Sequence, residues 1–163
     1  GLAKQINVSN YEAEEFLNSY FAKFPEIKVY MDNTIKFCRK SGYVNNIFGR
    51  RTHLSGIYDK NYNVRNFQER AAINAPIQGS ASEIMRLAMI KIEKKLSDQK
   101  SLRSKMLLQI HDELIFEVNE KEVDKMKKII KDEMVSVANS DHHSFSIPLT
   151  VDINSGENWG SLH

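Results

Sequence analysis

The chain has 163 residues, of which 41% are hydrophobic and 27% are charged, and its formal net charge at pH 7 is +2. A chain of about 150 residues typically buries around two-thirds of its unfolded surface, so one ordinary core is expected. The small net charge excludes the bulk basic excess that by itself indicates nucleic-acid binding, so phosphate binding depends on local clusters. Cys38 is the only cysteine, which excludes an internal disulfide. No stretch approaches the roughly 18 apolar residues of a membrane span, and no membrane partner is expected.

Two helices are expected near the start of the chain. Residues 11–40 carry apolar side chains at helical spacing in two sets, one on each side of Pro25. Proline suits the first position of a helix and disrupts an interior, so the two helices should meet near Pro25. Asn10 is expected to cap the first helix, and Gly42 is the stop signal of the second. A turn and a polar loop are then expected over residues 43–61.

A long helix is expected over residues 63–96, where good helix formers dominate and apolar residues keep a helical period. Pro76 lacks an amide donor and clashes with the preceding turn, so the helix should be curved or broken there. Three polar residues recur at every fourth position of this helix and should share one face: Arg70, Asn74 and Gln78. This row of one guanidinium and two carboxamides can donate hydrogen bonds along a groove.

Residues 105–118 form an apolar stretch that is interrupted at its centre by His111, Asp112 and Glu113. Two runs of strand-forming residues around a short polar break predict a hairpin. Crowded carboxylates repel each other unless a cation or a proton intervenes, and Mg²⁺ accepts one or two of them while leaving positions for phosphate oxygens. The turn is therefore a candidate metal site for phosphoryl chemistry. The alternative is a solvated hairpin in which Asp112 and Glu113 are ordinary turn residues.

The end of the chain predicts one more helix and one more strand. Residues 120–139 place apolar side chains on one face, which predicts an amphipathic helix. Residues 147–153 alternate between apolar and other side chains, which is the period of a strand. The expected fold class is α+β, with long helices and a small antiparallel sheet. We divide the chain into a helical segment at residues 1–104 and a segment at residues 105–163 with the hairpin, the amphipathic helix and the final strand.

Five motifs in this chain occur together in the order known from one enzyme family. They are Gly42-Tyr-Val, Gly49-Arg-Arg, Arg70-Ala-Ala-Ile-Asn-Ala-Pro-Ile-Gln-Gly-Ser-Ala, Gln109-Ile-His-Asp-Glu-Leu-Ile-Phe-Glu-Val and Ser155-Gly-Glu-Asn-Trp. On these motifs the chain closely resembles the carboxyl-terminal part of family A DNA polymerases, the bacterial DNA polymerase I type. The resemblance extends over essentially the whole chain and implies the end of the fingers and a palm-type sheet with its catalytic hairpin.

The resemblance implies template-directed DNA synthesis by two-metal phosphoryl transfer. Asp112 would be a ligand of two Mg²⁺ ions in the complete enzyme, and Glu113 would have a secondary catalytic part. In this family a second carboxylate comes from an earlier segment, so we expect this chain to be a fragment that is inactive alone. The expected partners are primer-template DNA, deoxynucleoside triphosphates and the missing amino-terminal part of the same polypeptide. The expected compartment is the bacterial cytoplasm or a DNA-containing organelle.

The resemblance also assigns the DNA contacts. The row of Arg70, Asn74 and Gln78 would read the minor groove of the primer-template, and Arg65 would contact the template strand. His111 would donate a hydrogen bond near the primer terminus, although a metal-ligand role is the alternative. Arg50 and Arg51 could grip phosphates or pair with acidic neighbours, and both readings stay open.

Four positions depart from the family pattern. Many relatives carry a second arginine where this chain has Val64, and Glu83 stands where the family usually has aspartate. Ser55-Gly56 replaces a common Leu-Pro pair. Val64 is expected to weaken the local grip on the template strand beside Arg65, whereas the departures at Glu83 and at Ser55-Gly56 touch none of the residues to which chemistry is assigned.

Two other classes of function remain open. A metal-dependent nuclease would share the carboxylate turn but needs further Asp, Glu or His residues converging from other strands, which the sequence does not show. A non-catalytic nucleic-acid-binding module would keep the polar row that begins at Arg70 and need no metal. Nucleotide addition that depends on Mg²⁺ would separate the three classes.

Overall fold

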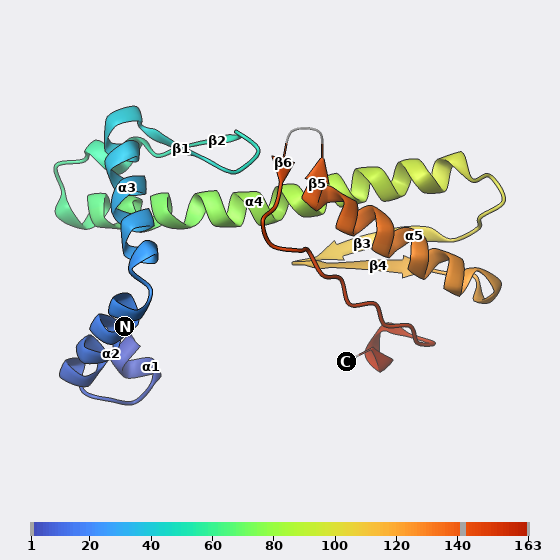
Figure 1. Ribbon diagram of the computed structural model, residues 1–163, viewed down its shortest axis with the longest axis horizontal. Coiled ribbons are helices and arrows are strands. Elements are labelled where there is room, and N and C mark those ends of the chain that lie inside the picture. Colours follow the sequence, from blue (N-terminus) through green and yellow to red (C-terminus); the bar gives the residue numbers. More distant parts are fainter. Residues whose placement is uncertain (1, 141–142, 163) are drawn as a thin grey trace. The chain divides into compact units, whose positions relative to one another are not determined.

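The computed structural model describes residues 2–140 and 143–162 (Figure 1). It contains two compact units, Gly1–Ile77 and Gln78–His163, and the long helix α4 runs through the boundary between them. The sequence-based division was placed at residue 104 instead. The compact units divide earlier because the second part of α4 shares a hydrophobic core with the helix that follows the hairpin.

The first unit begins with three helices, α1 (Leu2–Gln5), α2 (Asn10–Lys23) and α3 (Pro25–Ser41). The expected pair of helices on either side of Pro25 is confirmed, and Gly42 ends α3 in the left-handed region at φ +77°. The expected cap at Asn10 is wrong, since Ser9 is the N-cap of α2. Ser9 Oγ accepts from the Glu12 amide at 3.2 Å, and Glu12 Oε2 accepts from the Ser9 amide at 2.9 Å. A capping box requires a Glu or Gln three residues after the cap. Glu12 stands three residues after Ser9, whereas Ala13 stands three residues after Asn10.

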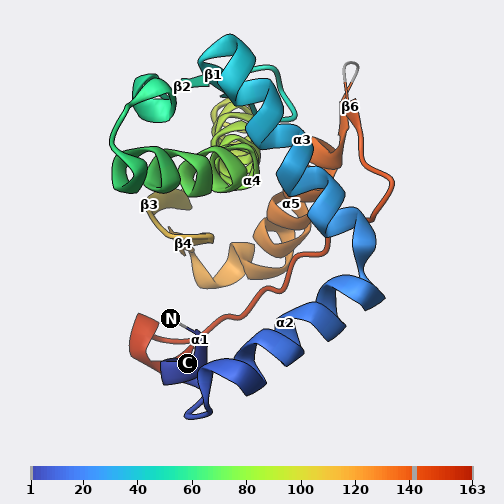
Figure 2. The same cartoon turned by 90° about the vertical axis from the view of Figure 1, so that its left-hand side faces the viewer.

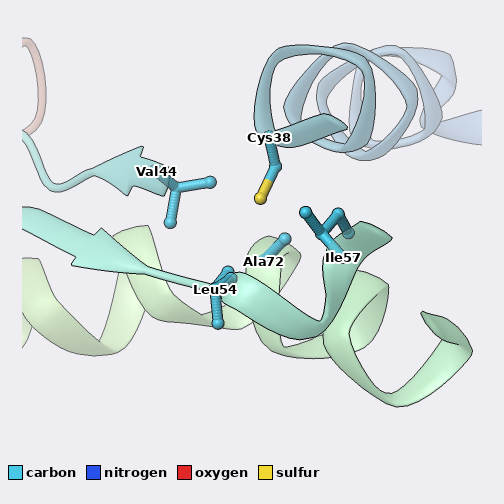
Figure 3. Close-up of a cluster of buried hydrophobic side chains, with 5 residues drawn as sticks. All are labelled: Cys38, Val44, Leu54, Ile57 and Ala72. Atoms are coloured by element: carbon cyan, nitrogen blue, oxygen red, sulfur yellow. The ribbon is translucent and has the colours of Figure 1, made fainter. Parts of the chain in front are cut away.

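Residues 43–61 contain regular structure that the sequence did not predict. Strands β1 (Tyr43–Asn45) and β2 (Arg51–His53) form an antiparallel pair, and a short 3-10 helix η1 (Ser55–Tyr58) follows. The core of this unit joins α3, β1, η1 and the start of α4 (Figure 3), and its buried side chains are those of Cys38, Val44, Leu54, Ile57 and Ala72. Burial raises the pKa of the Cys38 thiol, which keeps it protonated and inert as a core residue.

Helix α4 (Tyr62–Asp98) is continuous through Pro76, so of the two expected outcomes, a curved helix or a broken one, the break does not occur. Two contacts with α3 support its first part. The Arg39 guanidinium pairs with the Glu69 carboxylate, and the Tyr30 hydroxyl donates to the Ile73 carbonyl at 3.0 Å. These contacts favour the helical path of the backbone just before the proline.

The second unit packs the end of α4 against α5 (Val123–Val135) and the hairpin (Figures 1 and 2). Ile92 and Leu96 of α4 are buried against Met126 and Ile130 of α5, with partly buried side chains of β4 on the same cluster. Short 3-10 helices flank α5, η2 (Glu120–Glu122) before it and η3 (Ser136–Ala138) after it. The predicted amphipathic helix and the predicted α+β class are confirmed.

The predicted hairpin is also confirmed, as β3 (Lys105–Ile110) paired antiparallel with β4 (Glu113–Glu117). A second small pair joins β5 (Asn139–Ser140) to β6 (His143–Ser144), and a last 3-10 helix η4 covers Trp159–Ser161. The strand expected at residues 147–153 is wrong. A strand is defined by ladder hydrogen bonds, and within the described residues no neighbouring strand pairs with this segment. In residues 2–140 and 143–162, no helix combines the length and the apolarity that a membrane span requires.

Candidate active site

The turn of the hairpin presents its polar residues to solvent. His111 and Asp112 connect Ile110 to Glu113, which pair across the strands, so the loop is two residues long. His111 has φ +50°, and a positive φ at the first loop residue is the geometry that fits the twist of two-residue hairpins. The side-chain amide of Gln109 donates to the His111 carbonyl at 2.7 Å and fixes the turn. The structure thus brings together His111, Asp112 and Glu113, all of them exposed.

The turn borders a groove of about 1010 Å³ within the second unit. Its apolar lining comes from α4, β4, α5 and the carboxyl-terminal segment, including Ile84, Met85, Leu114, Phe116, Met126, Ile130 and Ile153. The carboxyl-terminal segment adds two further carboxylates, Asp152 and Glu157, and the sequence predicted a site role for neither, although Glu157 lies in the Ser155-Gly-Glu-Asn-Trp motif. The only signal for Asp152 is a charged residue inside the apolar alternation of residues 147–153. The groove therefore combines apolar side chains with carboxylates from three separate segments, which are the turn, η2 with Glu120, and the carboxyl-terminal segment.

The donor chemistry of the turn fits Mg²⁺ in part. Within the described part of the chain, no group of three His, Cys, Asp or Glu residues is placed to hold a metal ion. Mg²⁺ is usually bound through one or two carboxylates while water and phosphate oxygens fill its other positions. The exposed oxygens of Asp112 and Glu113 suit this mode of binding. A complete site requires at least one further group.

Helix α4 carries the predicted donor row. Arg70, Asn74 and Gln78 are all exposed and all lie within α4. In the first unit, Ala72 is fully buried, and Ala71 and Ala75 pack against the same core. The small residues thus face the protein, which leaves Arg70 and Asn74 available to a ligand. Gln78 is the first residue of the second unit.

Two of the arginines considered above are engaged inside the first unit. Arg65 donates to the Asp59 carbonyl at 3.1 Å, and its guanidinium lies 5.7 Å from the centre of the Tyr62 ring. The Arg51 guanidinium lies 4.5 Å from the centre of the Tyr43 ring. Such cation–π contacts hold a guanidinium in place while leaving its charge available.

Glu83 is buried in α4 and pairs with the Arg86 guanidinium one turn later. The hydrogen bond and the charge of Glu83 raise the pKa of Arg86 above its already high ordinary value. Glu83 is therefore committed to Arg86 and is not a candidate metal ligand.

The comparison with known protein families decides how this arrangement is classified. The sequence model of DNA polymerase family A matches residues 1–161. The chain belongs to DNA polymerase family A. The family A match covers both compact units and includes the hairpin turn and the donor row of α4.

Similar proteins include DNA polymerase I of Caldicellulosiruptor bescii, which is 45% identical over 159 residues. That alignment covers 98% of this chain and 18% of the relative. DNA polymerase I of Rhizobium leguminosarum is 44% identical over 164 residues, covering all of this chain and 16% of the relative. The structure of the POL domain of Pol1 from M. smegmatis, in complex with DNA primer-template and dNTP, superposes with a TM-score of 0.92. It is 37% identical and covers 99% of this chain and 28% of its own.

The family A chain thus spans less than a fifth of the length of these two relatives. The comparisons show the family and the fold of this chain. The role of each residue at the turn and on α4 stays a prediction.

Proposed function

We propose that this chain is the carboxyl-terminal part of a DNA-directed DNA polymerase that adds deoxynucleotides to a primer 3′-hydroxyl as a template directs. The observation that carries the proposal is the exposed pair of Asp112, in the two-residue turn, and Glu113, the first residue of β4, in a chain that belongs to family A. Relatives named DNA polymerase I support it, as does the similar solved structure with primer-template and dNTP. The expected setting is DNA replication or repair in a bacterial cell or a DNA-containing organelle.

The residues of the turn divide the work. Asp112, together with a carboxylate from an earlier segment of the polypeptide, would hold two Mg²⁺ ions, which when bound activate the primer 3′-hydroxyl and stabilise the leaving pyrophosphate. Glu113 is held by its pairing with Ile110 at the start of β4 and would support Asp112 from there. His111 would place its imidazole N–H against the primer terminus. Positioning and electrostatic stabilisation dominate phosphoryl transfer, so the chain needs no protein nucleophile.

The donor row of α4 would bind the minor groove of the primer-template. Adenine N3 and thymine O2 present equivalent acceptors there, and G·C pairs keep acceptors at the same positions. Arg70, Asn74 and Gln78 can therefore hold every correct pair without reading sequence. A mispair displaces the acceptors, so the same contacts would test the geometry of the pair. Arg65 would act near the template strand from the position that Asp59 and Tyr62 give it.

A primer-extension assay tests the proposal. The complete polypeptide is incubated with a 5′-labelled primer on a template, with Mg²⁺ and one deoxynucleoside triphosphate at a time. We expect the primer to lengthen by one residue with the complementary triphosphate alone, and only when Mg²⁺ is present. Shortening of the strand would support the nuclease alternative, and binding without any change in length would support the binding module. Either result would contradict the proposal.

The 163-residue chain assayed alone is expected to add no nucleotide. The resemblance to family A implies that the partner carboxylate comes from an earlier segment, so the metal site is expected to be incomplete in this chain alone. Templated extension by the purified 163-residue chain would show that this division of the machinery is wrong.

A further inference from the structure

The end of the hairpin opposite the turn, which we call the root, is held by hydrogen bonds around one carboxylate. Glu122 accepts from the backbone amide of Arg103 at 3.1 Å to each carboxylate oxygen, and from the amide of Ser104 at 3.0 Å. The Ser104 hydroxyl also donates to Glu122 and accepts from the Asn119 amide at 3.2 Å. Ser104 precedes β3 directly, and Asn119 is the second residue after β4. One carboxylate and one hydroxyl therefore join the two strands at the root.

The root network fits a carboxylate that is charged in the folded state. The Ser104 hydroxyl is the largest cause of a pKa of Glu122 below its usual value, opposed by desolvation and assisted by the Arg103 and Ser104 amides and by Lys125. Ser104 is buried, so the network is partly shielded from water. Hydrogen bonds to an ionised acceptor are shorter and stronger than those to a neutral one.

The hydrogen bonds of Glu122 and Ser104 at the root are called the clamp below. The pairing of β3 with β4 shows why the root needs it. Met106 lies opposite Phe116, but Leu108 lies opposite Ile115, so Leu107 is an extra residue in β3. Expelling this bulge requires one strand to slip by one residue, which turns the slipped side chains to the other face. The two-residue turn fixes the register at its own end, so slippage is possible only at the root. Such a slip would turn Ser104 away from Glu122.

A β-bulge bends its strand and changes the direction of the residues beyond it. The bulge at Leu107 lies between the root and the turn, so its position affects where the turn points. An isolated two-stranded hairpin is at best marginally stable, which makes the contacts outside the ladder decisive.

We propose that Glu122 is a positioning residue, which fixes the bulged register of β3 against β4 and thereby holds the turn that carries Asp112. This inference rests on the proposed function for its effect on nucleotide addition. The clamp itself is a property of the fold and does not depend on that function.

The test uses the complete polypeptide and compares Glu122→Gln with Asp124→Asn. Asp124 lies in the first turn of α5 and is exposed, so its substitution removes one charge two residues away from Glu122. The glutamine keeps one acceptor oxygen, but it replaces the other with a donating amide that faces backbone donors and it removes the charge, so the clamp should weaken. Amide hydrogen exchange in residues 103–110 should accelerate at least about tenfold in Glu122→Gln and remain unchanged in Asp124→Asn.

The kinetic part of the test separates positioning from folding. In Glu122→Gln, kcat for single-nucleotide addition should fall roughly ten- to a hundredfold at unchanged primer-template affinity and nearly unchanged KM. Glu122→Asp keeps the charge and should recover part of both losses. Ser104→Ala removes only the hydroxyl and should give the same changes at smaller size, which keeps the test decisive if Glu122→Gln fails to fold.

Two outcomes would overturn the inference. Unchanged exchange at residues 103–110 in Glu122→Gln would show that there is no clamp. Faster exchange with an unchanged kcat would show that the clamp does not position the turn. If the parent polypeptide adds no nucleotide at all, the proposed function fails, while the exchange measurement still decides whether the clamp exists.

Discussion

The two ends of the β3–β4 hairpin use carboxylates in opposite ways. At the turn, Asp112 and Glu113 are exposed, and within the described residues no hydrogen bond or ion pair engages their side chains. At the root, Glu122 accepts hydrogen bonds from Arg103 and Ser104. The same chemical group therefore remains available to an external cation at one end and is satisfied by the protein at the other.

The two ends together show how a small hairpin can serve as a rigid support. A ligand site needs unsatisfied oxygens, and unsatisfied carboxylates repel each other and contribute little stability. The holding forces must then come from elsewhere, here from the root network and from the core in which Ile92 and Met126 are buried.

The largest effect is expected from removing the charge at the turn. In the complete polypeptide, Asp112→Asn should slow single-turnover nucleotide addition by roughly a thousandfold. Loss of one preorganised electrostatic group from an active site typically slows a reaction by this much. Affinity for primer-template should change little because the shape of the turn is preserved. Glu113→Gln should cost less. Turnover of Asp112→Asn within a few-fold of the parent would refute the metal assignment.

A substitution in the core between α4 and α5 should lower the stability of the fold rather than change the catalytic groups at the turn. Ile92 is fully buried, and Ile92→Ala should lower the free energy of unfolding by about 3 kcal/mol through lost burial and the cavity left behind. Ile90, on the same helix, is 52% exposed, so Ile90→Ala should change stability by about 0.5 kcal/mol or less. Denaturant midpoints of the two variants measure the difference. Equal midpoints would show that the core does not support this unit.

The exposed row of Arg70, Asn74 and Gln78 on α4 resembles the turn of the hairpin, because its hydrogen-bond donors are available to a ligand. Arg70→Ala and Gln78→Ala should each weaken extension of matched primers by about 1–3 kcal/mol per lost contact. Their discrimination against mismatched primer ends should also shrink. Primers with 3-deazapurines, which lack the acceptor, should reproduce the defect in the parent and add little to the variants. A reduced salt dependence without sensitivity to the base analogue would move Arg70 from the groove to the backbone.

The smallest effect is expected from the root network in acid. The folded pKa of Glu122 lies below its ordinary value of 4.5, so its contribution to stability is complete above pH 4.5 and is lost as the pH falls through the lowered pKa. Unfolding curves of the parent and of Glu122→Gln should therefore differ at neutral pH and converge in acid. If the free energies of unfolding of the two proteins differed by the same amount at neutral and at acid pH, the charge of Glu122 would not contribute to stability.

Much of the fold follows from local sequence signals. The helices around Pro25, the stop at Gly42 and the hairpin around Asp112 each depend on neighbouring residues, and each prediction agrees with the structure. The cap at Ser9 was missed because Asn10 is an equally good cap by residue type. Only the reciprocal bond with Glu12 separates the two.

The failures depend on partners that are distant in the sequence. The alternation of residues 147–153 does not form a strand because alternation creates an apolar face but supplies no neighbouring ladder. The hairpin of β1 and β2 was missed because three-residue strands are too short to show a period. At the candidate site, the turn followed from sequence, whereas the carboxylates of Asp152 and Glu157 reach the groove only through the tertiary fold.

The most direct test of the central claim is to locate the metal. Crystals of the complete polypeptide with primer-template and Mn²⁺ in place of Mg²⁺ would show the ion by its anomalous scattering. We expect a peak within ligand distance of the Asp112 carboxylate in the parent and its loss in crystals of Asp112→Asn. A peak bound by other residues, or one unchanged in the variant, would contradict the assignment of the hairpin turn as the metal-binding end of the molecule.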